Sequence, residues 1–156
     1  MARRDPLVRH LGIAFVFALL LYLVAYWAIE SRRTRAGGWQ VTFQTDAVGV
    51  PSLEVSQANL KIRNVRLSFP GQTAAPPALN QTIVFDRPKT NLPFGSVVYM
   101  DTTFLPGAIV FGMFGHEVQL APRVLSVDQR VFDWKSVAAM QIPEKGRSPT
   151  PLPPMP

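Results

Sequence analysis

The sequence contains no cysteine and only two histidines. Without cysteine, disulfide bonds, thiolate metal sites and cysteine nucleophiles are excluded. His10 borders an apolar segment and His116 lies in a predicted hairpin turn, whereas a metal site needs three or four converging ligands. We therefore expect no metal site and no cofactor.

Recognisable catalytic motifs are also missing. There is no Gly-x-Ser-x-Gly elbow, no second histidine in the region after residue 36 to serve a triad, and no glycine-rich phosphate loop between a strand and a helix. Asp86, Asp101, Asp128 and Asp133 could supply a carboxylate pair of the glycosidase type, but each lies near a predicted strand end, where aspartate commonly caps a turn. We predict that the protein is not an enzyme.

The positive charge is unevenly spread along the chain. The formal net charge is +6; residues 1–35 hold six arginines against two acidic residues, and residues 36–156 hold ten basic against eight acidic residues. Most of the excess thus flanks an apolar segment, where basic residues meet anionic lipid headgroups. Because no basic stripe or recognised motif is present, we expect membrane lipid as a partner and no nucleic acid.

The apolar segment is an uncharged run of nineteen residues, 11–29, that reads LGIAFVFALLLYLVAYWAI. At 1.5 Å per residue such a helix is about 28 Å long, close to the hydrocarbon thickness of a bilayer. After a short basic N-terminal tail, residues 1–10, we predict a transmembrane helix over residues 11–30. The predicted membrane-interface residues are aromatic or basic: Arg9, Tyr22, Tyr26, Trp27, Arg32, Arg33 and Arg35.

A cleaved signal peptide is the competing interpretation, since it also has a basic stretch before an apolar run. Signal peptides typically have a shorter apolar region that ends in small residues, whereas this run ends in Tyr26, Trp27 and Ile29. We therefore favour an uncleaved signal anchor. Its alanines at positions 14, 18 and 25 share one helix face, so Ala14, Ala18 and Ala25 are candidates for packing against another helix.

The distribution of charge gives only a weak indication of how the predicted helix is oriented in the membrane, because three arginines precede the apolar run and three follow it. The short leading tail and the free N-terminal amine favour a cytoplasmic N-terminus and an extracytoplasmic domain. A small extracytoplasmic domain without disulfides is ordinary in bacteria. The expected location is the bacterial inner (cytoplasmic) membrane, crossed once, with a periplasmic domain.

The remaining chain is predicted to form an all-β domain. Fifteen prolines and ten glycines punctuate short stretches of alternating or continuous apolar residues. We expect a connector over residues 31–38 and seven or eight strands over residues 39–142, arranged as a β-sandwich-like domain, immunoglobulin-like or a small barrel. A β-bulge is predicted at Asn64, a two-residue type II′ turn at Gly115-His116, and one or two helical turns within residues 135–142.

Residues 143–156 are predicted to form an extended Pro-rich tail that docks on a partner. The candidate docking residues are Pro149, Pro151, Leu152, Pro153, Pro154 and Met155.

Two functional hypotheses follow from this architecture. The first is a non-catalytic, single-span accessory subunit of a multi-subunit membrane complex, respiratory or photosynthetic, whose domain and tail pack on its extracytoplasmic face. Trp39, Tyr99, Phe104 and Trp134 are its candidate contact or core aromatics. The second is a membrane-tethered module that binds a small ligand, glycan or peptide through residues 70–81 and 86–95.

Overall fold

The computed structural model describes residues 6–74, 80–144 and 149–152. The chain divides into two compact units, residues 1–35 and residues 36–156. The first unit is helical and the second is built from strands. Each is described by itself.

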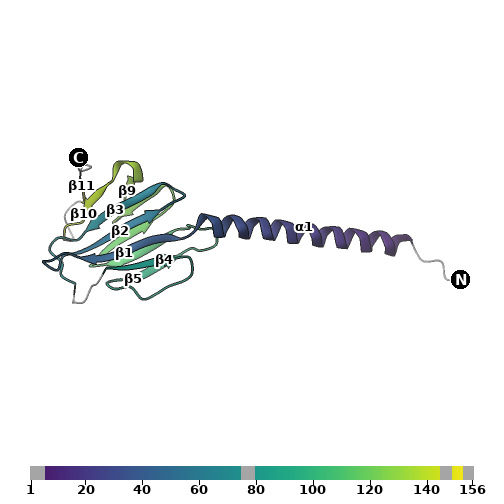
Figure 1. Ribbon diagram of the computed structural model, residues 1–156, viewed down its shortest axis with the longest axis horizontal. Coiled ribbons are helices and arrows are strands. Elements are labelled where there is room, and N and C mark those ends of the chain that lie inside the picture. Colours follow the sequence, from purple (N-terminus) through teal and green to yellow (C-terminus); the bar gives the residue numbers. More distant parts are fainter. Residues whose placement is uncertain (1–5, 75–79, 145–148, 153–156) are drawn as a thin grey trace. The chain divides into compact units, whose positions relative to one another are not determined.

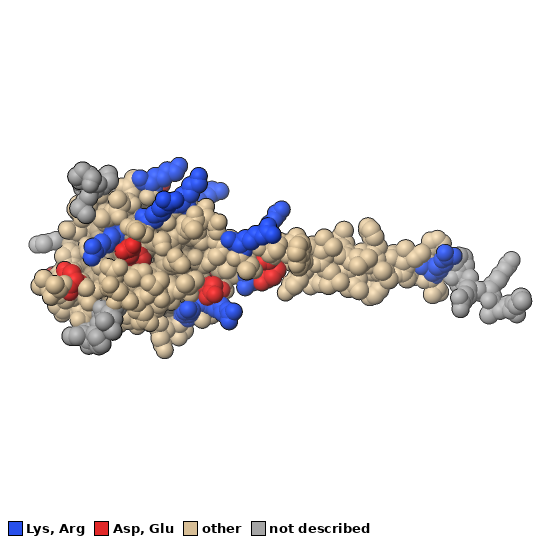
Figure 2. All heavy atoms as spheres, in the orientation of Figure 1, with Lys and Arg blue, Asp and Glu red and all other residues tan. Residues whose placement is uncertain are grey.

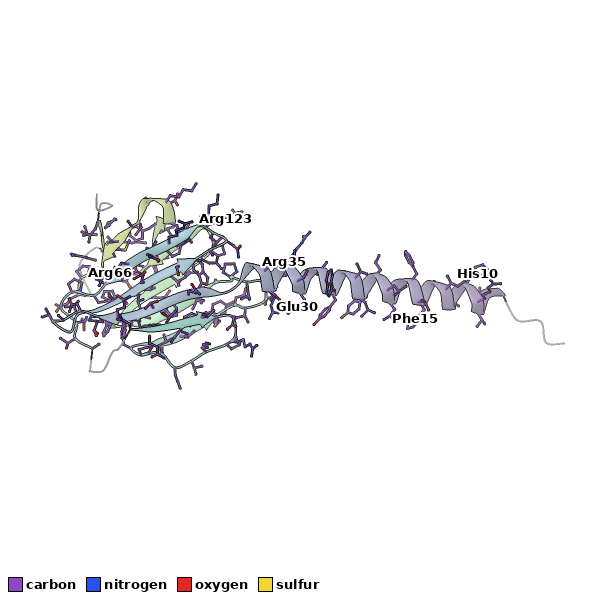
Figure 3. All side chains as sticks on the ribbon, viewed as in Figure 1. His10, Phe15, Glu30, Arg35, Arg66 and Arg123 are labelled. Atoms are coloured by element: carbon purple, nitrogen blue, oxygen red, sulfur yellow. The ribbon has the colours of Figure 1, made fainter. Side chains whose placement is uncertain are left out.

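Helix α1 runs from Pro6 to Ala36 and is 31 residues long. Proline suits its first position, because that backbone N–H has no partner within a helix. Within the described residues, α1 is the one helix long and apolar enough to cross a membrane. Its apolar side chains project outward, as the sticks along α1 in Figure 3 show.

The helix extends beyond its predicted end, so the predicted connector over residues 31–38 is largely wrong. Residues 31–36 are helical, and the hydroxyls of Ser31 and Thr34 donate to the carbonyls of Ala28 and Glu30. These bonds let polar residues remain in the helix without competing for its backbone. Helical structure stops at Gly37, whose φ of 68° fits the left-handed position that commonly ends a helix.

The second unit is a β-sandwich, as predicted, and its strands form two separate sheets rather than one closed barrel (Figure 1). The six-stranded sheet has the order β11-β10-β3-β2-β1-β4 and the five-stranded sheet the order β5-β6-β7-β8-β9. All pairings are antiparallel except that of β10 with β3. The strands of the first sheet are β1 (Trp39–Thr45), β2 (Pro51–Gln57), β3 (Ile62–Ser68), β4 (Gln81–Phe85), β10 (Ala139–Gln141) and β11 (Thr150–Leu152). Those of the second are β5 (Ser96–Met100), β6 (Ile109–Met113), β7 (His116–Leu120), β8 (Val124–Val127) and β9 (Arg130–Asp133), which the 3₁₀ helix η1 (Trp134–Ser136) follows.

The core lies between the two sheets and follows from period-2 alternation. In β1, Trp39, Val41 and Phe43 are 0% exposed, and the residues between them face the other side of the sheet. Aromatic rings meet across the sandwich, with centroids 5.3 Å apart for Phe85 and Phe111. Each such fully buried side chain contributes roughly 1.5–3 kcal/mol to the free energy of unfolding.

The predicted bulge is confirmed. Val55 pairs with Val65 and Gln57 pairs with Ile62, so two residues of β3 lie opposite Ser56. Asn64, one of the two, has a φ of 50°, a region that asparagine tolerates better than most residues. The extra residue restores the inward facing of both Ile62 and Val65.

The β6–β7 hairpin turn lies one residue earlier than predicted. Met113 pairs with His116, so the turn residues are Phe114 and Gly115, with φ values of 50° and 81°. Positive φ at both positions indicates a type I′ turn instead of type II′. The Phe114 ring packs 5.3 Å from Phe69 and 5.5 Å from the ring of Phe94, and these contacts hold a bulky residue in the turn.

The predicted helix over residues 135–142 is also largely wrong. Only Trp134–Ser136 is helical, and residues 139–141 form β10. The backbone N–H groups of Arg66 and Ile142 donate to the carbonyls of Ala138 and Ser68, which ties this segment to β3. Met140 is buried in β10 and its two neighbours are less buried, which is the alternation of a strand. The short apolar run in the sequence did not show this alternation.

Candidate functional site

All the predicted interface residues lie on α1. Tyr22, Tyr26 and Trp27 are exposed along the helix, and the Tyr22 and Tyr26 rings stack with centroids 6.3 Å apart. Arg33 lies 3.7 Å from the Glu30 carboxylate, an i,i+3 pair that offsets part of the positive charge. These side chains have the composition of an interface belt, whose contact with lipid remains a prediction.

Helix geometry places the three candidate packing alanines on one face of α1. At 100° per residue, Ala14, Ala18 and Ala25 fall within about 40° of one another. Sequence reasoning missed Gly12, which lies about 160° around the helix from Ala14. A shallow hollow of about 470 Å³ is formed there, lined mainly by Val8, Ile13, Val16, Phe17 and Leu20. Small residues thus lie on two faces of α1. Gly12 was the only feature of the sequence that could have indicated the second face.

The described parts of the predicted docking tail are residues 143–144 and 149–152; Pro153, Pro154 and Met155 lie outside the described residues. Thr150–Leu152 forms strand β11, which pairs antiparallel with β10 in the register Met140 to Pro151. An edge strand is where a sheet tolerates proline, which has no N–H to donate. Among the described strands β11 has β10 as its only neighbour, so no described strand pairs with its other backbone edge.

A hollow of about 580 Å³ lies on the outer face of the six-stranded sheet beside β11. Its lining includes the polar groups of Ser52, Arg66, Ser68 and Gln141, the acidic side chain of Asp46 and the apolar side chain of Leu152. Arg66, labelled in Figure 3, donates from Nη2 to Ser52 Oγ at 3.4 Å. A guanidinium beside hydroxyl and amide groups can bind a carboxylate or another acceptor-rich group. The sequence had shown Arg66 only as an exposed basic residue, because the tail that borders it is over eighty positions away.

His116 is buried, contrary to its predicted place in the turn. It begins β7, is 3% exposed, and its Nδ1 lies 2.6 Å from Asp128 Oδ2. Since a carboxylate only accepts, we assign the proton to Nδ1. Asp128 Oδ1 also accepts from the backbone N–H of Glu117 at 2.9 Å. The pair therefore joins the β6–β7 hairpin to the β8–β9 turn.

The side chains around His116 are not those of a catalytic site. The shallow hollow beside it is lined by Val98, Glu117 and residues 112–115, which offer no hydroxyl, thiol or amine nucleophile. Its Nε2 is buried without a hydrogen-bond partner. In the described residues no three His, Cys, Asp or Glu side chains are grouped to hold a metal ion.

Three of the four candidate aspartates cap backbone groups. Asp101 Oδ1 accepts from the N–H of Thr103 and Asp133 Oδ1 from that of Lys135, each at 2.9 Å. Hydrogen bonds from the Thr103 backbone and then its hydroxyl lower the pKa of Asp101 below its ordinary value, against a small opposing effect of burial. Three of these carboxylates are thus engaged with backbone N–H groups of their own or a neighbouring turn.

The predicted contact aromatics separate into two groups. Trp39 and Trp134 belong to the core, with ring centroids 5.4 Å apart, whereas Tyr99 and Phe104 are 57% and 67% exposed. In the predicted binding loop 86–95, Phe94 is buried against Phe43. Part of the other predicted binding loop, residues 75–79, lies outside the described residues.

These features define a class of protein: a β-sandwich domain that follows an N-terminal helix long and apolar enough to span a membrane. Comparison with protein-family models, with curated proteins and with solved structures finds no match to the chain.

Proposed function

We propose that the protein is a non-catalytic, single-span accessory subunit of a membrane protein complex. In this proposal α1 anchors the chain in a bacterial inner membrane with its N-terminus in the cytoplasm, and the β-sandwich lies in the periplasm. The sandwich and the C-terminal tail contact a neighbouring subunit and stabilise the assembly.

The observation that carries the proposal is the edge strand β11. Three tail residues, Thr150–Leu152, form the outermost strand of the six-stranded sheet, and no described strand pairs with its outer edge. An open edge can accept a further strand from a partner, with main-chain hydrogen bonds giving affinity. Pro151 blunts pairing between identical edges, because it withholds one donor. The edge therefore suits a partner that matches this pattern of donors.

The test compares the migration of the native assembly after gentle solubilisation of the host membrane. The full chain should migrate in a discrete assembly larger than itself, and a chain ending at residue 148 should leave it while keeping its folded tryptophan fluorescence. A full chain that migrates alone in mild detergent would contradict the proposal. Retention of the truncated chain would remove β11 as the contact.

The alanine face of α1 supplies an independent arm of the same test. Ala14→Leu combined with Ala18→Leu widens the face that is proposed to pack on a neighbouring helix. Val16→Leu combined with Val24→Leu is the matched control, because those positions lie on other faces of α1. We expect only the alanine variants to weaken the assembly.

The hollow beside β11 favours a second candidate function, a membrane-tethered binding module. Arg66, Ser52 and Gln141 would hold a small acceptor-rich ligand or the carboxylate of a peptide. In that case the purified full chain in detergent binds ligand with no other protein present, and Arg66→Gln abolishes the binding. Arg130→Gln, which changes an exposed arginine of the five-stranded sheet, is the control.

A further inference from the structure

One end of the sandwich is organised around Trp39. Its indole Nε1 donates to the Gly107 carbonyl at 3.0 Å, and its ring packs on Trp134, whose Nε1 donates to the Ala121 carbonyl at 2.8 Å. Trp39 also pairs with Phe85 at the end of β4. The loops and strand ends near residues 58–63, 86–89, 101–108, 121–123 and 133–136 therefore meet at this end, which we call the Trp39 end.

Basic residues are concentrated at the Trp39 end. The described residues of the domain include eight lysines and arginines, and six of them belong to these segments: Lys61, Arg63, Arg87, Lys89, Arg123 and Lys135. Three acidic residues accompany them, Asp86, Asp101 and Asp133, which gives a net charge of +3. Two of these carboxylates are already engaged in capping their own turns.

The opposite end carries the opposite charge. The segments that lie there contain Asp46, Glu117, Asp128 and Glu144 against Arg130 alone among the described residues, a net charge of −3. In Figure 2 most basic side chains on the visible face of the domain lie toward one end, with an acidic one beside them, and an acidic side chain lies at the other end close to a basic one. The described residues of the domain therefore have a charge asymmetry along the strands, although eight basic and eight acidic residues give them a net charge of zero in sum.

An exposed phenylalanine projects among these charges. Phe104 is 67% exposed at the tip of the β5–β6 loop. The loop is held by the bond from Trp39 to Gly107 and by the Asp101 cap, and a Cβ at Gly107 would collide with the Asp101 carbonyl. Close backbone packing thus holds the loop that carries Phe104. An exposed apolar ring at the same end of a domain as several lysines and arginines is the composition of a surface that enters the headgroup layer of a membrane.

Chain length keeps this end near the last residue of α1. Only Gly37 and Gly38 separate Ala36, the last residue of α1, from Trp39. Three peptide steps span at most about 11 Å. Whatever the orientation of the domain, Trp39 stays within that distance of the last residue of α1.

We propose that the Trp39 end rests on an anionic phospholipid bilayer, with Phe104 in the headgroup layer and the six basic side chains on lipid phosphates. This contact depends on the proposed anchoring by α1 and adds a second attachment, which fixes how the domain stands on the membrane. The acidic end then faces away from the lipid.

The absence of cysteine from the native chain allows a direct test. Single cysteines replace Phe104, Val48 and Leu20 in the full chain, each carrying a nitroxide label, in nanodiscs of phosphatidylcholine with or without phosphatidylglycerol. Val48→Cys is the matched control, because Val48 is an apolar residue 82% exposed in the turn between β1 and β2, at the acidic end. Leu20→Cys reports on the anchor itself.

Accessibility to oxygen and to a water-soluble nickel chelate then measures depth. We expect the label at position 104 to be shielded from nickel and reached by oxygen in anionic nanodiscs, and the label at position 48 to remain fully open to nickel. Equal nickel accessibility at both positions overturns the proposal if the Leu20 label lies deep in the bilayer. A Leu20 label open to nickel overturns the anchor instead, so the two failures are distinguishable.

Charge variants test the lipid specificity. Arg123→Gln with Lys135→Gln should lessen the shielding at position 104 in anionic nanodiscs, as should high salt, because screened or missing charges bind phosphate less well. Arg130→Gln, at the acidic end, should leave the shielding unchanged. Equal effects of the two variants, or equal shielding with and without phosphatidylglycerol, contradict a contact with anionic lipid.

Discussion

Removing the Asp128 carboxylate should destabilise the sandwich by about 2–4 kcal/mol, because it leaves a buried histidine without its partner. His116 is 3% exposed, and an orphaned buried donor costs about 1–3 kcal/mol. The N–H of Glu117 also loses its acceptor, a net bond of about 0.5–1.5 kcal/mol. Asp128→Gly is the suitable change, since glycine tolerates the φ of 48° at this position.

The neighbouring turn residue provides the control. Gln129 has a φ of 67°, so Gln129→Gly makes the same backbone change at the next position. Its effect should lie within about 1 kcal/mol of zero, because relief of the positive φ offsets the added freedom of the unfolded chain. The assay is urea unfolding of the full chain in micelles, followed by tryptophan fluorescence. Equal midpoints for the two variants would refute the reasoning.

A double-mutant cycle isolates the pair. In a His116→Phe background the buried donor is gone, so Asp128→Gly should cost about 1–3 kcal/mol less than in the native chain. Additive effects would mean that the 2.6 Å contact contributes nothing to stability.

Three further outcomes are expected. Gly107→Ala should destabilise the domain by about 2–4 kcal/mol, since its Cβ meets the Asp101 carbonyl, whereas Gly49→Ala, with open space around it, should cost about 1–2 kcal/mol in the same unfolding assay. Asn64→Gly should change stability by under about 0.5 kcal/mol and Asn64→Val should cost about 1–2 kcal/mol, because a branched side chain resists the positive φ of the bulge. The Asp101 carboxyl should titrate by NMR below an ordinary aspartate, so its loop cap is present above the unfolded pKa and is lost as pH falls through the folded pKa; Thr103→Ala should raise that pKa only in part, and an unchanged midpoint would exclude the hydroxyl as a cause.

Local patterns in the sequence predicted much of this fold. Strand β1 shows strict alternation from Trp39 to Phe43, and the slip of that pattern around Asn64 was enough to place the bulge. Such features depend on the period of one strand alone. The apolar run from Leu11 likewise predicted the helix from length and composition.

The errors arose where contacts distant in sequence decide the structure. Strand β10 is only three residues long and exists through its pairing with β3, some seventy positions earlier. The β6–β7 turn lies one residue earlier than predicted because the rings of Phe69 and Phe94 hold Phe114 at positive φ. Conformational propensity assigns positive φ in such a turn to glycine or asparagine. The edge strand β11 looked like an unpaired proline-rich tail for the same reason.

The candidate surfaces were harder still, because each assembles residues from several loops. Lys61, Arg87, Arg123 and Lys135 are spread over more than seventy positions, and their sequence spacing carries no period. The contacts around Trp39 and the pairing of β2 with β1 and β3 place them at one end. The net charge counted along the sequence therefore gives the sum for the domain. It does not show that the basic and acidic residues lie at opposite ends.

This arrangement separates folding from surface function. The contacts that gather the loops are buried and come from Trp39 and Trp134, whereas the side chains proposed to touch lipid are exposed. Exposed substitutions away from caps and special backbone positions typically change stability by under about 0.5 kcal/mol. Phe104 and the basic side chains other than Lys61, whose φ is 59°, can thus be changed without unfolding the domain. A truncation of Trp39 would disrupt both the core and the loops. Loss of membrane contact in a Phe104 variant can therefore be attributed to the surface itself.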